Sequence, residues 1–232
     1  MKRVAQGRPW PHTFPFSLAE FRECLIRWGE AHFQDLPWRH TRDPYKVLIA
    51  EVLLHRTQAR QVVPIYREFL QSYPSLASLS SAPQQEIASI LMPLGLRWRT
   101  NLLLRMVEVI EARHGGEIPR AYGELMELPG ISHYIAAAVR CFAFGMPEAV
   151  IDTNTVRVLG RVLGVQVRDS TRRTVAMREI AYGLLDVDRP GEYNFSLLDL
   201  AHQVCTVRTP PACSVCPLVS MCKFTQHGPS VT

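Results

Sequence analysis

Four cysteines lie close together near the C-terminus. They follow the spacing C-x7-C-x2-C-x5-C, at Cys205, Cys213, Cys216 and Cys222. Thiolates this close in sequence can ligate one [4Fe–4S] cluster or one zinc ion. Clustered cysteines in an intracellular protein indicate a metal site rather than disulfides, so we expect these four side chains to bind metal.

Asp152 is a carboxylate whose neighbours predict a helix directly after it. Val156, Leu159 and Leu163 recur at helical spacing and form an apolar stripe. The local pattern alone therefore predicts that Asp152 is the N-cap of this helix. A negative charge at such a position is stabilised by the helix N-terminus.

Glu51 is a second carboxylate, within a helix that we expect to begin at Pro44. Val47, Leu48 and Leu54 recur at spacings near three and four, and Glu51 shares their apolar side. A buried carboxylate can act as an acid. It can equally be the structural partner of an arginine, and the spacing leaves both interpretations open.

A tight turn is predicted at 128–132, where the sequence reads L-P-G-I-S. Pro129 and Gly130 force the turn, because glycine adopts positive φ without steric cost. Helices expected over about 121–127 and 132–144 flank it. Backbone N–H groups at the start of the second helix could bind a phosphate without reading base sequence. A simple connector between helices is the alternative interpretation.

Helices must position these residues, because no alternating run has the length and turn signals of a β-hairpin. Periodicity, caps and Gly or Pro stops predict an all-α fold. The expected helices cover about 17–33, 43–54, 61–72, 84–92, 97–113, 121–127, 132–144, 153–164, 172–185 and 193–204.

The composition of the 232 residues is that of an ordinary globular protein, 47% hydrophobic and 20% charged. No apolar run reaches the roughly 18 residues that a membrane span needs. No apolar run follows the basic N-terminus either, so we expect no signal peptide and no membrane partner. The formal net charge of +5 suits a phosphate-rich partner, although many soluble proteins are mildly basic.

Together, these motifs resemble the helix–hairpin–helix DNA glycosylases of the endonuclease III and MutY superfamily. That family has L-P-G-V-G, a helix, and then an aspartate in V-D-x-N or V-D-x-H. Residues 128–154 match this pattern except at Ser132, where the family usually has a second glycine. Residues 36–39 and 50–58 are similar to the L-P-W and S-E-V-M-L-Q-Q-T-Q stretches of MutY-type enzymes, and 193–200 is similar to F-N-x-x-x-x-D. The superfamily cysteine spacing is C-x6-C-x2-C-x5-C, one residue shorter than here.

The resemblance implies an all-α protein of two helical lobes. One lobe would be six helices over 41–146, including the helix–hairpin–helix motif. The other would be discontinuous, combining 1–40 with 147–232 and carrying a C-terminal [4Fe–4S] cluster loop. The implied partner is double-stranded DNA, bound by a monomer located in the cytoplasm with the nucleoid.

For the chemistry, the resemblance implies that Asp152 is the catalytic carboxylate. Its negative charge would stabilise the positive charge that develops on deoxyribose as the N-glycosidic bond breaks. Glu51 matches the glutamate that protonates the departing adenine in MutY-type enzymes, and the thymine-specific relatives keep a glutamate there too.

Tyr134 occupies the position of the lysine nucleophile of endonuclease III. Tyrosine cannot form a Schiff base, so this sequence resembles a monofunctional glycosylase that leaves the strand uncut. A tyrosine here is similar to the mismatch-specific thymine glycosylases of the archaeal Mig type, and some adenine glycosylases also have it. A tyrosine packed in the core is the alternative interpretation.

The resemblance also implies DNA contacts. Arg56 would fill the gap left by the extruded nucleotide and Leu96 would be a second wedge, although Leu96 could also be an ordinary turn hydrophobe. Gly130 and Ser132 would bind a phosphate through the hairpin, and Asn154 is a further DNA-binding candidate.

The expected function is therefore excision of thymine or uracil opposite guanine in base excision repair. Adenine excision opposite G or 8-oxoguanine, as in MutY, is the first alternative. Those enzymes usually carry an additional C-terminal domain, which we expect to be absent because the sequence ends shortly after Cys222. Oxidised-pyrimidine excision with strand cleavage is a second alternative, and Tyr134 argues against it. A non-catalytic DNA-binding module is a third, and retention of Asp152 and Glu51 argues against that.

Overall fold

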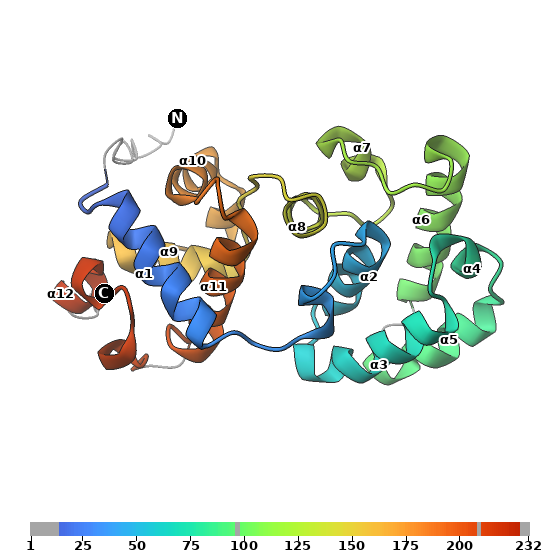
Figure 1. Cartoon of the computed structure of the whole chain (residues 1–232), viewed down its shortest axis with the longest axis horizontal. Coiled ribbons are helices and arrows are strands. Elements are labelled where there is room, and N and C mark those ends of the chain that lie inside the picture. The colour runs from blue at the N-terminus through green and yellow to red at the C-terminus, as the bar shows by residue number, and fades with distance from the viewer. Residues whose placement is uncertain (1–13, 96–97, 208–209, 228–232) are drawn as a thin grey trace, which may run out of the picture. The chain divides into compact units, whose positions relative to one another are not determined.

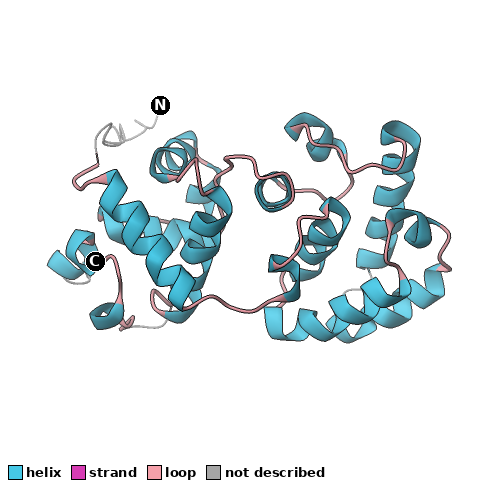
Figure 2. Ribbon diagram, viewed as in Figure 1, coloured by secondary structure: helices cyan, strands magenta, loops and turns pink. Residues whose placement is uncertain are grey.

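The structure, a computed structural model, describes residues 14–95, 98–207 and 210–227. All regular secondary structure in these residues is helical, with no strand (Figure 2). The predicted all-α fold is thus confirmed. The α-helices are α1 Leu18–Ala31, α2 Pro44–Leu54, α3 Ala59–Ser72, α4 Leu76–Ser80, α5 Gln84–Leu91, α6 Trp98–His114, α7 Tyr122–Glu127, α8 His133–Phe142, α9 Thr153–Leu163, α10 Val175–Leu184, α11 Pro190–Gln203 and α12 Lys223–His227. Short 3-10 helices cover Pro37–Arg39, Met92–Leu94, Asp169–Arg173, Cys213–Val215 and Val219–Met221.

The expected helices are present, with differences at their ends. α11 begins at Pro190, three residues earlier than expected, because proline is well suited to the first helical position. α4 and α12 were not predicted, since five residues are too few to show helical periodicity. α4 begins at the Ser75 cap, where the Ser75 hydroxyl accepts a hydrogen bond from the Ser78 N–H at 3.2 Å.

The chain divides into two compact units (Figure 1). Unit 1 joins the residues up to Phe33 to those from Ile151 onward, and it contains α1 and α9 to α12. Unit 2 runs from Gln34 to Val150 and contains α2 to α8.

In unit 1, α1 packs along α11, and α11 packs against α9. The crossing of α1 and α11 depends on Gly29, because a Cβ there would lie 1.9 Å from Ser196 Oγ and 3.0 Å from Ser196 Cα. Phe21 and Tyr193 are buried in the same core, with ring centroids 6.5 Å apart. This packing holds α9, whose N-terminal cap is Asp152.

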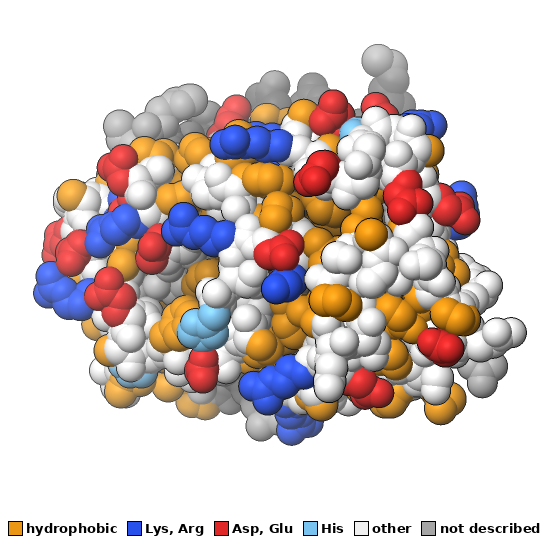
Figure 3. Space-filling view, turned by 45° about the vertical axis from the view of Figure 1, so that its right-hand side comes forward, with side chains coloured by type: hydrophobic (Ala, Val, Ile, Leu, Met, Phe, Trp, Pro, Cys, Tyr) orange, Lys and Arg blue, Asp and Glu red, His pale blue; other side chains and the backbone are white. Residues whose placement is uncertain are grey.

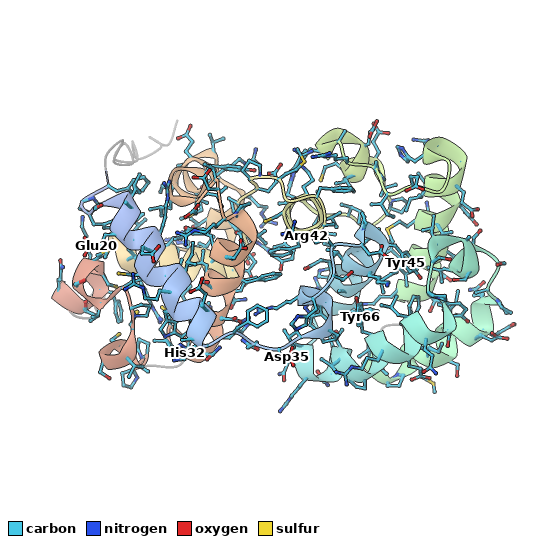
Figure 4. All side chains as sticks on the ribbon, viewed as in Figure 1. Glu20, His32, Asp35, Arg42, Tyr45 and Tyr66 are labelled. Carbon is cyan, nitrogen blue, oxygen red and sulfur yellow. The ribbon has the colours of Figure 1, made fainter. Side chains whose placement is uncertain are left out.

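In unit 2, α2 packs against α3 and α8, and α7 packs against α8. α2 is apolar almost all round, which is typical of a helix enclosed by others. Tyr45 on α2 and Tyr66 on α3 (Figure 4) are buried, and burial raises the pKa of both phenols. The Tyr45 hydroxyl donates to the Tyr73 carbonyl at 2.8 Å. No helix in the described part of the chain has the length and apolar character of a membrane span.

Candidate active site and cysteine cluster

Asp152 is the N-cap of α9, as its neighbours predicted. Its Oδ1 accepts hydrogen bonds from the backbone N–H groups of Asn154, at 2.8 Å, and Thr155, at 2.7 Å. Its Oδ2 accepts a third from Asn154 Nδ2 at 2.7 Å. The Asp152 N–H donates in return to Thr155 Oγ1 at 2.9 Å, which completes a capping box. The half-buried carboxylate is therefore fixed in orientation by three donors.

Arg157 connects this cap to the end of α11. Its Nη1 donates to Asn154 Oδ1 at 3.1 Å, its Nε to the Cys205 carbonyl at 2.9 Å, and its Nη2 to the Ala201 carbonyl at 3.0 Å. Burial lowers the pKa of Arg157, and the negative groups at Cys205 and Asp152 act in the opposite direction. Asn154, predicted as a DNA contact, thus lies between the Asp152 carboxylate and this guanidinium.

The four clustered cysteines line a single hollow in unit 1, of about 370 Å³ including space open to solvent. Its walls come from α9, the end of α11 and the segment after it, and they include Cys205, Cys213, Cys216 and Cys222. No group of three or more Cys, His, Asp or Glu side chains among the described residues is arranged to hold a metal ion.

The surroundings of the hollow place a positive charge beside the sulfurs. Arg161 Nη1 donates to Cys205 Sγ at 3.3 Å, and its guanidinium lies 5.0 Å from the centre of the Phe224 ring. The Cys222 thiol donates to the Arg161 carbonyl at 3.5 Å. Burial raises the pKa of Cys216 to about 11 and also raises that of Cys222. Bound metal would offset the cost of burying a thiolate, because it stabilises the deprotonated form of the side chain.

The predicted hairpin joins α7 to α8. Gly130 has φ +78°, and a Cβ at this position would lie 2.5 Å from both Leu102 methyl carbons, so both conformation and space require glycine. Ser132 caps α8, and its hydroxyl accepts a hydrogen bond from the Ile135 N–H at 3.2 Å. The serine that replaces the family's second glycine therefore has a clear local role at the N-terminus of α8.

Glu51 and Tyr134 belong to unit 2, on two helices that pack together. Glu51 is 5% exposed on α2, and Tyr134 is half-buried in the first turn of α8. Asp152 belongs to unit 1.

Arg56 lies in the turn between α2 and α3, with an exposed side chain and a φ of +61°. A left-handed backbone is uncommon for a residue other than glycine. Leu96, the second predicted wedge, lies outside the described residues.

Two arginines were missed by the sequence analysis, although they contact the residues next to Asp152 and next to Arg56. Arg157 could have been noticed, because its spacing of three from Asn154 places both on one face of the helix. Arg99 could not, since its partners precede it by more than forty residues.

The charges on the face drawn in Figure 3 are mixed. Lys and Arg side chains are interspersed with Asp and Glu side chains and with apolar ones. The net charge of +5 is therefore not gathered into one basic patch on that face.

No family model matches the chain. A thymine-DNA glycosylase from Aeropyrum pernix is 42% identical over 208 residues, which cover 88% of this chain and 93% of that protein. A thymine/uracil-DNA glycosylase from Pyrobaculum aerophilum is 42% identical over 215 residues, covering 89% and 92% of the two chains. This chain belongs to the thymine/uracil-DNA glycosylase family.

Two solved structures resemble this glycosylase. A thermostable thymine-DNA glycosylase superposes with a TM-score of 0.83 at 32% identity, covering 90% of this chain and 96% of that one. An endonuclease III–DNA complex superposes with a TM-score of 0.75 at 22% identity, which shows a common fold. The resemblance to the endonuclease III and MutY superfamily is confirmed, and the protein is a DNA glycosylase.

Adenine DNA glycosylases are also related to this chain. The human protein is 34% identical over 217 residues, which cover 89% of this chain but 40% of that protein. The identity is lower than with the two archaeal thymine glycosylases, as the sequence motifs predicted.

Proposed function

We propose that this glycosylase hydrolyses the N-glycosidic bond of thymine or uracil opposite guanine in duplex DNA and leaves the DNA strand intact. The observation that carries this proposal is the Asp152 carboxylate, held at the N-terminus of α9 by three hydrogen-bond donors. The similarity to the archaeal thymine and thymine/uracil glycosylases supports the choice of base.

In the proposed reaction, the bond between C1′ and the base nitrogen breaks and the sugar becomes positively charged. The Asp152 carboxylate stabilises that charge because its orientation is fixed before the reaction begins. Water adds its oxygen to C1′, and a proton ends on the released base. The Asn154 and Thr155 contacts act here by fixing the carboxylate.

Tyr134 decides the fate of the strand in this proposal. A phenol has no amine to attack C1′, so no Schiff base forms and no lyase step follows. Glu51 is proposed as the second carboxylate, which donates a proton or a hydrogen bond to the departing base. Its burial on α2 is consistent with an acid working away from bulk water.

Binding of duplex DNA is proposed to use the α7–α8 hairpin and the turn at Arg56. The Gly130 turn exposes the N-terminus of α8, where a phosphate is stabilised by backbone N–H groups and by the helix dipole. The exposed Arg56 guanidinium would occupy the gap left when a nucleotide is extruded. We further propose that the protein acts as a monomer, in the cell compartment that holds chromosomal DNA.

We propose that Cys205, Cys213, Cys216 and Cys222 hold a [4Fe–4S] cluster. Their position around one hollow supports this, as does the Arg161 guanidinium beside Cys205, since a thiolate-ligated cluster adds negative charge. The cluster would supply a structural crosslink between the segment after α11 and the C-terminal segment, whose helix α12 packs against α9. A broad visible absorption that is lost when iron is removed would distinguish it from zinc.

The function is tested with end-labelled duplexes that contain G·T, G·U, A opposite 8-oxoguanine, or thymine glycol. Strand breaks at G·T or G·U that develop only after alkali treatment are the expected result, because excision leaves an intact abasic strand. Breaks on the adenine duplex alone would indicate a MutY-type activity. Breaks without alkali would contradict the monofunctional proposal, and no excision from any duplex would indicate a DNA-binding module.

A further inference from the structure

Arg99 is a fully buried arginine in the first turn of α6, and its guanidinium reaches the end of α2. Its Nη1 donates to the Leu53 carbonyl at 2.9 Å. Its Nη2 donates to the His55 carbonyl and to Thr57 Oγ1, the latter at 3.0 Å. All these contacts lie within unit 2. One side chain thus binds three successive parts of the chain where α2 ends.

These acceptors lie immediately around Arg56. His55 precedes it and Thr57 follows it, and both contact the Arg99 guanidinium. Arg56 itself has a φ of +61°, and its side chain is exposed. A residue with a Cβ remains in this left-handed region only when its surroundings hold it there. The Arg99 hydrogen bonds on either side supply such a restraint.

An arginine is well suited to binding the carbonyl groups at the end of α2. The last carbonyls of a helix have no partner within the helix, and a cation is favoured beside them. Arginine presents several donors in a rigid plane, so it can reach separate acceptors at once, which a lysine ammonium cannot match in geometry. Burial lowers the pKa of Arg99 to about 10, so the guanidinium stays protonated and keeps its donors at neutral pH.

We propose that Arg99 is a positioning residue that holds the 55–57 turn in its strained conformation and thereby presents the Arg56 side chain to the gap left by the extruded nucleotide. The inference rests on the proposed function of Arg56. It adds that Arg56 is effective only because Arg99, from a distant part of the sequence, fixes the backbone on both sides.

A double-mutant cycle tests this coupling, with Arg99→Lys, Arg56→Ala and the variant carrying both. The measured quantity is the dissociation constant for a duplex with a stable abasic-site analogue opposite guanine, compared with an undamaged duplex. We expect each single variant to bind the analogue about tenfold more weakly, and the double variant to be no weaker than Arg56→Ala. Arg105→Lys, at an exposed position of the same helix, is the matched control and is expected to bind as wild type.

Two results would overturn the inference. In the first, Arg99→Lys weakens binding by the same factor with and without the Arg56 side chain, which means that Arg99 acts by another route. In the second, folded Arg99→Lys binds the analogue as tightly as wild type. If wild type shows no preference for the analogue over the undamaged duplex, the proposed function itself fails, so the two failures are distinguishable.

If Arg99→Lys does not fold, Thr57→Val tests the positioning role of Arg99 in its place. This variant removes one acceptor from a half-buried position and preserves side-chain shape. The expected loss of affinity is about threefold, and it should vanish in the Arg56→Ala background. A loss that persists in full without the Arg56 side chain, or no loss at all, would contradict the positioning role.

Discussion

At Asp152, the hydrogen bonds that cap α9 also fix the orientation of the carboxylate, as the proposed chemistry requires. The sequence predicted the cap from the apolar stripe of the following helix, and the structure adds the third donor, Asn154 Nδ2. It also adds Arg157, which anchors Asn154 from the other side. This second contact could not be predicted, because Arg157 is fixed by carbonyls at the end of α11 that only the tertiary fold brings near.

Arg157→Met tests that anchor. The change leaves the Cys205 and Ala201 carbonyls without this donor, which we expect to cost about 1–3 kcal/mol each in the free energy of unfolding. It should also slow excision, because Asn154 loses its support. Urea unfolding and single-turnover excision measure the two effects. Arg178→Met, at an exposed position of α10, is the control and should stay within about 0.5 kcal/mol of wild type. An Arg157→Met protein as stable and active as wild type would contradict the role of Arg157 in supporting Asn154.

The residue at 134 should determine whether DNA is trapped covalently. Borohydride reduces an imine between protein and sugar, and a phenol cannot form one. We therefore expect no covalent complex between wild type and a G·U duplex, and none with Tyr134→Phe. Tyr134→Lys supplies the missing amine and is expected to give a slower-migrating protein–DNA band on a denaturing gel. A strong band with wild type would be incompatible with a role for Tyr134 in keeping the strand intact.

At the scale of elements, local signals predicted the helices well where they were long and capped. Asp152 is an N-cap as expected, and Ser17 and Asp43, the first residues of two expected helical segments, are N-caps too. α4 and α12 escaped prediction because they are single short turns. The left-handed backbone at Arg56 also escaped it, because nothing in the local sequence marks a positive φ at an arginine.

The α7–α8 hairpin should be sensitive to its glycine. Gly130→Ala forces a Cβ into a positive-φ position 2.5 Å from the Leu102 methyl carbons, and we expect it to destabilise the protein by about 1–3 kcal/mol. It should also weaken duplex binding, because the turn aims the N-terminus of α8. Gly123→Ala is the matched control, since nothing lies within 4 Å of its Cβ on α7, and there we expect a gain of about 0.5–1 kcal/mol. Equal effects of the two changes in thermal unfolding would show that the turn geometry is unimportant.

At the scale of the whole molecule, the cysteine hollow and the hairpin belong to different units. The hollow contacts α9 and the end of α11 in unit 1, whereas the α7–α8 hairpin belongs to unit 2. The spacing of the cysteines predicted a metal site, which stays a proposal. The sequence could not show that Arg157 and Arg161, on adjacent turns of α9, connect the Cys205 segment to the helix that Asp152 caps.

Removal of the proposed cluster should therefore affect the units differently. We expect hydrogen exchange in the iron-depleted protein to accelerate in α9 and α11, because the cysteine-bearing segments that contact these helices lose their crosslink. Exchange in α2 and α8 should change little. Mass spectrometry of peptides from each helix would measure this. Equal acceleration in both units, or none in α9, would contradict a structural cluster confined to unit 1.

The central claim is that Asp152 breaks the glycosidic bond, and Asp152→Asn tests it most directly. Asparagine caps a helix about as well as aspartate, so the free energy of unfolding should stay within about 1 kcal/mol of wild type. Excision of uracil from a G·U duplex under single-turnover conditions should fall by at least about 100-fold, because the negative charge is gone. A folded Asp152→Asn protein that excises uracil within about tenfold of the wild-type rate would contradict the account.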